Sequence, residues 1–138
     1  MATGETSQGE GARPLSPHLQ VYTAQINMIM SIIHRITGAA LYFGTLLLAV
    51  WLIAAASSPE QFETINALFG SLLGRLVMLG YTWALLHHML GGIRHFIWDV
   101  GSGFGLGQVD FLCWLSLILS LAGTVAIWVV AGGFQGVF

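Results

Sequence analysis

Histidine and arginine side chains interrupt two long apolar stretches of the chain. His34 and Arg35 lie in the first stretch, and His88 and His95 lie in the second. If these stretches cross a membrane, each buried polar group costs about 2.5–3.5 kcal/mol even on insertion scales. Side chains buried at that cost are functional candidates. An imidazole can bind a metal, and a guanidinium can donate hydrogen bonds to an anion or a carbonyl oxygen.

The second group has the spacing of a cofactor site. His88 and His95 are seven residues apart, so a helix presents them on one face. Gly91 and Gly92 lie between them and remove side-chain bulk, which leaves room for a flat macrocycle near the backbone. Histidine is a common axial ligand of haem iron, and a neutral imidazole suits an apolar site. Haem ligation is therefore one interpretation of this pattern.

Two other interpretations fit the same residues. A histidine here could hydrogen-bond across helices, with the glycine pair allowing close helix packing, or it could belong to a proton relay. Zinc is disfavoured because no third and fourth ligands lie at a familiar spacing. His87 points about 100° away from His88. The two cannot face one iron, so His87 is expected to be hydrogen-bonded elsewhere.

The first group combines a hydroxyl with a guanidinium. Ser31 and Arg35 are four residues apart and share a helix face, with His34 alongside. Both are polar groups at the start of an apolar stretch, so they are functional candidates. The alternative is that Arg35 extends to lipid headgroups while Ser31 bonds its own helix backbone.

Composition defines the surroundings of these residues. Of 138 residues, 56% are hydrophobic and 7% are charged, and the mean hydropathy is +0.80. Soluble domains carry about 25% charged residues. The chain is therefore not a water-soluble globule, a disordered chain or a nucleic-acid binder, because each needs far more charge. The single cysteine, Cys113, excludes a disulfide framework and a cysteine-based metal cluster.

Charge-free runs define the elements. Three runs contain no charged residue: 36–59, 76–93 and 111–138. Each is close to the roughly 20 residues that a helix needs to cross a bilayer, and a backbone in lipid must satisfy its own hydrogen bonds. We predict an all-α membrane protein with three transmembrane helices at roughly 27–56, 66–98 and 109–133.

Connections and arginines predict the orientation. The glycine-rich segment 100–107 is expected to be a surface turn, because the dinucleotide pattern G-x-G-x-x-G fails there in every register. Arg13 precedes the first predicted helix, and Arg94 lies near the end of the second, beside this turn. The 57–65 connection, at the opposite side of the membrane, has two acids and no base. Positive charge favours the cytoplasmic side for the N-terminus and the glycine turn. Arg75 argues mildly against this orientation.

The N-terminal segment predicts the compartment. Residues 1–26 begin with a polar, acid-containing stretch that has neither the basic-then-apolar pattern of a secretory signal nor the arginine-rich composition of a transit peptide. We expect residues 1–26 to be a cytoplasmic segment and 27–138 to form the membrane domain. A bacterial inner membrane fits better than a mitochondrial one.

Three ordered motifs resemble a known family. They are R-P-L-S-P-H-L-Q-V-Y at 13–22, S-I-I-H-R-I-T-G at 31–38, and H-M-L-G-G-I-R-H-F-I-W-D at 88–99. Together they resemble the cytochrome b subunit of succinate dehydrogenase, one of two small membrane anchors of respiratory complex II. The resemblance implies half of a heterodimeric helical bundle that binds haem b and tethers the flavoprotein and iron–sulfur subunits.

The resemblance also assigns haem contacts. The axial ligand in this family is the first histidine of H-x-x-x-G-I-R-H, here His88. The second axial histidine comes from the partner anchor subunit. His34, Arg35 and His95 are expected to contact the haem propionates, where a cation offsets carboxylate charge. Arg94 is expected at the same cytoplasmic end.

Ubiquinone is the implied substrate in the membrane. Ser31 and Arg35 resemble the family's quinone-site residues, and Asp99 is expected on the proton path. FAD and iron–sulfur clusters belong to the partner subunits only, because one cysteine cannot ligate a cluster. This chain is thus implied to be a subunit of succinate:ubiquinone oxidoreductase that does not oxidise succinate alone.

Three alternatives stay open at this level. The first is an anchor of a quinol:fumarate reductase, since these residues do not set the direction of catalysis. The second is a haem-free structural anchor in which His88 only hydrogen-bonds a neighbouring helix. The third is a small transporter or channel subunit, which is disfavoured because the polar residues gather at one end of the predicted bundle.

Overall fold

The computed structural model describes residues 22–132, and within this range it contains four α-helices and no strand. The helices are α1 (Ile26–Ser57), α2 (Pro59–Gly70), α3 (Leu72–Asp99) and α4 (Leu106–Val130). Of these, α1, α3 and α4 are long and apolar enough to cross a membrane. The predicted all-α class with three such helices is confirmed. Apart from Tyr22, the motif at 13–22 lies outside the described residues.

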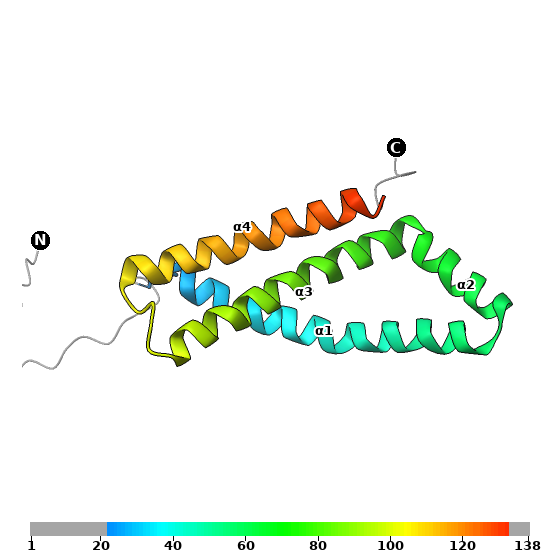
Figure 1. Ribbon diagram of the computed structural model, residues 1–138, viewed down its shortest axis with the longest axis horizontal. Coiled ribbons are helices and arrows are strands. Elements are labelled where there is room, and N and C mark those ends of the chain that lie inside the picture. The colour runs from blue at the N-terminus through cyan, green and yellow to red at the C-terminus, as the bar shows by residue number, and fades with distance from the viewer. Residues whose placement is uncertain (1–21, 133–138) are drawn as a thin grey trace, which may run out of the picture.

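The three long helices pack against one another (Figure 1). Helices α1 and α3 cross and then diverge, and α2 bridges the ends that lie apart, while α4 runs along α3. The glycine-rich segment between α3 and α4 is a turn, as expected. Gly101 and Gly103 adopt φ angles of +80° and +78° there, a region that side chains with a Cβ rarely occupy.

The predicted helix 66–98 is wrong in its first part. The structure ends α2 at Gly70 and starts α3 at Leu72, because Ser71 between them adopts an extended conformation. The Ser71 hydroxyl accepts a hydrogen bond from the backbone N–H of Gly74, with 3.1 Å between the two atoms. A serine at this position satisfies one of the free N–H groups of a new helix. The sequence therefore contains a helix start at Ser71 that hydropathy does not detect.

The other boundaries differ from the expected ones by one to three residues at each end. The first helix was expected at 27–56 and is α1. The third was expected at 109–133, but α4 starts three residues earlier, because the Gln108 side chain accepts from the Gly105 N–H at 3.2 Å and caps the helix there. Asp110 is the fifth residue of α4.

The helices meet through small and polar residues. The buried positions of α1 include Thr37, Gly44 and Ala54, and those of α4 are Cys113, Ser116, Ser120 and Thr124. Large apolar side chains point outwards; for example, Tyr42 and Phe96 are each 70% exposed. This distribution is typical of membrane helices, whose interfaces use small residues that let backbones approach closely.

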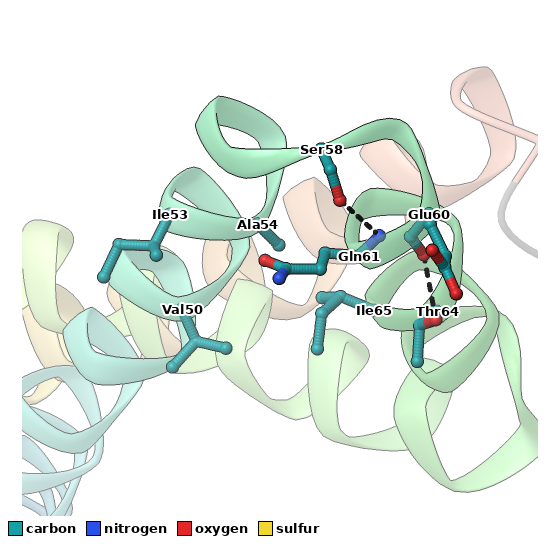
Figure 2. Close-up of a pocket in the computed structure, with 8 residues that line it drawn as sticks. All are labelled: Val50, Ile53, Ala54, Ser58, Glu60, Gln61, Thr64 and Ile65. Carbon is teal, nitrogen blue, oxygen red and sulfur yellow. Dashed lines mark hydrogen bonds between the residues drawn. The ribbon is translucent and has the colours of Figure 1, made fainter.

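A cavity of about 500 Å³ lies between the end of α1 and α2. Figure 2 shows Gln61 and Ile65 of α2 extending toward Val50 and Ile53 of α1 across it. Ser58 closes one end and accepts a hydrogen bond from the Gln61 backbone N–H at 3.3 Å. Of the α1 residues that line the cavity, Val50 is nearest to His34 and lies about 24 Å from it along the helix axis. This cavity is therefore separate from the histidines.

Candidate functional site

Three imidazoles from two helices form one cluster, which we call the histidine cluster: His34 of α1 with His88 and His95 of α3. The rings of His34 and His88 stack in parallel, with 4.0 Å between centroids and 4° between planes. The His95 ring lies 5.4 Å from that of His34 at 50°. His34 and His88 are partly buried and His95 is exposed. The structure thus brings together three histidines that are up to 61 residues apart in the sequence.

The position of the His88 ring is fixed through its Nδ1 atom. That atom lies 3.1 Å from the backbone carbonyl oxygen of His34 and 3.4 Å from Thr37 Oγ1. A carbonyl oxygen only accepts, so a neutral His88 donates its proton from Nδ1 to it. The interhelical hydrogen bond considered from the sequence is therefore present. It leaves the lone pair on Nε2, which has no hydrogen-bond partner among residues 22–132.

Two glycines allow the helices to come this close. A Cβ on Gly38 would lie 2.9 Å from His88 Cε1, and a Cβ on Gly91 would lie 2.9 Å from His34 Cε1. Both distances are shorter than real Cβ contacts. The sequence suggested that Gly91 and Gly92 together leave room for a macrocycle. The His34 imidazole fills that room at Gly91, whereas a Cβ on Gly92 would have no group from elsewhere in residues 22–132 within 4 Å, apart from its own stretch of helix.

Ser31 and Arg35 lie on the exposed side of α1, one turn apart and next to His34. Ser31 lines a cavity of about 400 Å³ together with Tyr22, Asn27, Met28 and Ile32. Arg35 is not among the lining residues of that cavity. The structure thus gives Ser31 a partly enclosed space, and Arg35 lies one turn further along the same exposed side of the helix.

Sequence reasoning missed two residues at this end. The Asn27 Oδ1 atom is buried beside the same cavity and has no hydrogen-bond partner in the described part of the chain. Asn27, Ser31 and Arg35 are spaced by four residues, a signal that could have revealed Asn27. Thr37 is 2% exposed and bonds His88. No sequence signal distinguishes it from other threonines that bond their own helix.

Two other polar residues of α3, His87 and Arg94, point to α4. His87 is 1% exposed, and its Nδ1 lies 3.3 Å from Ser120 Oγ, which agrees with the expected hydrogen bond elsewhere. Arg94 was expected with the propionate and proton-path groups. Instead it is 4% exposed and contacts Cys113 and Ser116 of α4. Arg94 follows His87 by seven residues, so both share the face that α4 covers.

The expected propionate and proton-path groups reach the surface at the end of α3. The exposed His95 ring meets Trp98 edge-on, with 5.2 Å between centroids. Asp99 is the last residue of α3, and its side chain is exposed. His95 joins the histidine cluster, and Asp99 lies about one turn beyond it.

The donor set fits one axial ligand. Within residues 22–132 no three His, Cys, Asp or Glu side chains are arranged to hold a metal ion. A metal on His88 would therefore take its other ligands from outside residues 22–132, for example from a prosthetic group or a second chain. An imidazole with its proton fixed on Nδ1 and its lone pair on Nε2 is the form that binds a metal, so the geometry fits a haem iron.

Comparison with known proteins determines the family. Residues 10–131 match the family described as succinate dehydrogenase/fumarate reductase transmembrane subunit. The chain belongs to this family. The match includes all three motifs and every residue of the histidine cluster, and it agrees with the resemblance found in the sequence.

Individual relatives of this transmembrane subunit family are similar over most of their length. The chain is 46% identical to the succinate dehydrogenase cytochrome b556 subunit of Paracoccus denitrificans over 98 residues, 71% of this chain and 75% of the relative. It is 38% identical to the cytochrome b556 subunit of Rickettsia felis, over 85% and 91%. The mitochondrial cytochrome b560 subunit of Sus scrofa is 38% identical, over 83% and 69%. The chain is thus a multi-pass membrane subunit of a succinate dehydrogenase-type family.

Proposed function

We propose that this chain is the haem b-binding membrane anchor of a succinate:ubiquinone oxidoreductase in a bacterial inner membrane. The single observation that supports it best is the His88 ring, whose Nδ1 is bonded to a backbone carbonyl and whose Nε2 has no hydrogen-bond partner among residues 22–132. Family membership supports the complex, and the naming of relatives as cytochrome b supports haem.

In this proposal His88 supplies one axial ligand and a second small anchor subunit supplies the other. Bound haem would accept and release one electron at a time. His34 stacks on His88 and keeps its ring plane fixed. His34, His95 and Arg35 would contact the haem propionates. The His34 and His95 rings are neighbours, and Arg35 follows His34 in α1. All three side chains carry N–H groups that can donate to a carboxylate.

Ser31 and Arg35 would bind ubiquinone. The Ser31 hydroxyl and the Arg35 guanidinium both donate hydrogen bonds, so they orient a quinone carbonyl oxygen at the cavity beside Ser31. As the quinone gains two electrons, its oxygen becomes negative, and fixed donors stabilise that charge. Asp99, exposed at the end of α3, would pass protons from the aqueous side to the reduced quinone.

The remaining work belongs to partner subunits. A flavoprotein with FAD would oxidise succinate, and an iron–sulfur subunit would carry the electrons to the quinone. The helix faces with large exposed apolar residues would contact lipid and the second anchor. The N-terminus and the glycine turn would face the cytoplasm. The same chain would serve a quinol:fumarate reductase if electrons ran in the opposite direction, and the family description includes both complexes.

The deciding experiment is a dithionite-reduced minus oxidised visible spectrum of the tagged chain, purified with its partners in mild detergent. We expect a b-type haem band together with a flavoprotein. His88→Leu should remove at least nine-tenths of the haem per flavin, whereas His87→Leu should retain it, since His87 faces α4. Flavoprotein without haem in the wild type would identify a haem-free anchor. The absence of both would favour a transporter subunit.

A further inference from the structure

Arg94 is a buried cation with neutral neighbours. Its side chain is 4% exposed, and one guanidinium nitrogen, Nη1, lies 3.3 Å from Cys113 Sγ and 3.4 Å from Ser116 Oγ. Its guanidinium carbon lies 5.2 Å from the centre of the Trp98 ring. The Nε atom is buried and has no hydrogen-bond partner in the described part of the chain. The site therefore holds the guanidinium by dipoles and an aromatic face.

Within residues 22–132 Arg94 forms no ion pair, and its hydrogen-bond acceptors are a thiol and a hydroxyl. Asp110 is exposed about one turn before Cys113 on α4, and its charge acts on that thiol through space. An unpaired charge in an apolar interior is expensive, and a guanidinium does not escape the cost by losing its proton. The positive charge is therefore fixed, and lipid and protein of low dielectric constant screen it weakly.

The position of Arg94 couples this charge to His88. The two residues are six positions apart in α3, about 9 Å along the helix axis. Their side chains leave the helix toward different neighbours, His88 toward α1 and Arg94 toward α4. Arg94 therefore acts on a group at His88 through its electric field and makes no contact with it.

We propose that Arg94 raises the reduction potential of the haem bound at His88, an inference that rests on the haem site proposed above. Reduction adds one negative charge at the iron, and a fixed cation nearby stabilises the reduced form. Charge and burial around a haem are the means by which a protein sets its potential. Arg94 would act through its charge and without touching the haem. Its contacts with Ser116 and Trp98 hold that charge at a constant distance from His88.

The test is a redox titration of the haem absorption band in the purified complex with its partners. Arg94→Gln removes the charge and keeps a donor toward Ser116, whereas Arg94→Lys keeps the charge. Ser116→Asp places a carboxylate beside the intact guanidinium. Arg75→Gln is the matched control, because Arg75 lies on the same helix but about 20 Å along its axis from His88.

We expect Arg94→Gln and Ser116→Asp to lower the potential, with Arg94→Lys and Arg75→Gln close to wild type. Wild-type potentials in haem-loaded Arg94→Gln and Ser116→Asp would overturn the proposal. So would an Arg94→Lys variant that matches Arg94→Gln, since geometry and not charge would then matter. Loss of haem from both Arg94→Gln and Ser116→Asp would assign Arg94 a structural role instead. A wild-type complex without haem would refute the haem site itself.

Discussion

At the scale of single residues, the site depends on how His88 is held. The histidines themselves were evident from the sequence, because polar groups in apolar runs are rare and costly. The carbonyl of His34 and the hydroxyl of Thr37 that fix the His88 ring were not evident. A backbone carbonyl has no sequence signal, and its position depends on how two helices cross.

The first prediction concerns the close approach at Gly91. Gly91→Ala should place a Cβ against the His34 ring, displace that ring from His88 and cost about 1–3 kcal/mol of stability. We expect a lower thermal midpoint and reduced haem content in the purified complex. Gly80→Ala on the same helix is the control, because nothing lies within 4 Å of its Cβ. Equal effects of both substitutions would contradict this packing.

The second prediction concerns the proposed quinone donors, Ser31 and Arg35. Ser31→Ala and Arg35→Leu should each lower succinate:quinone reductase activity at least tenfold, because in the proposed site each removes a donor to the quinone oxygen. Succinate oxidation with an artificial dye should persist, since it needs only the partner subunits. Ser57→Ala is the matched control at the opposite end of α1, where the hydroxyl bonds the Ile53 carbonyl of its own helix. Parallel loss of both activities would indicate failed assembly.

At the scale of elements, α3 presents different polar residues to α1 and to α4. One face carries Tyr81 and His88 against α1, and the other carries His87 and Arg94 against α4. Adjacent residues of a helix differ by about 100° in direction, which the sequence predicts for His87 and His88. Which neighbouring helix covers each face was decided only by packing.

The third prediction concerns the corner between α2 and α3. Gly74→Ala should destabilise the subunit, because its Cβ would meet the backbone of Leu68 and Phe69, which cannot rotate away as a side chain can. Gly70→Ala has open space around its Cβ and should be tolerated. Thermal midpoints of the two purified variants provide the comparison. A destabilised Gly70→Ala with an unaffected Gly74→Ala would show that the corner is formed differently.

At the scale of the whole molecule, the chain covers little of its own surface. In the most apolar window of α1 only 11% of residues are buried, and in that of α4 only 22%. Lipid and partner subunits must cover the rest. The orientation of the helices in the membrane then decides which side the proposed quinone donors and Asp99 face.

The fourth prediction tests this orientation. A cysteine introduced at Ser102 in the α3–α4 turn should react with a membrane-impermeant maleimide only after the inner membrane is opened. A cysteine at Glu63 in α2 should react from the periplasmic side. Wild-type Cys113 is fully buried and should give no background in either case. The reverse labelling pattern would place the N-terminus outside the cytoplasm.

Hydropathy and motif spacing alone determined that this chain is an all-helical membrane protein, which histidines are exceptional, and which family it resembles. These properties depend on the cost of transferring residues into lipid and on helical periodicity, which are local. Tertiary structure alone decided that His34 fills the space at Gly91, that Arg94 is buried against α4, and that α2 ends at Gly70. Each depends on which backbones approach each other, and glycines and serines permit that approach without specifying its partner.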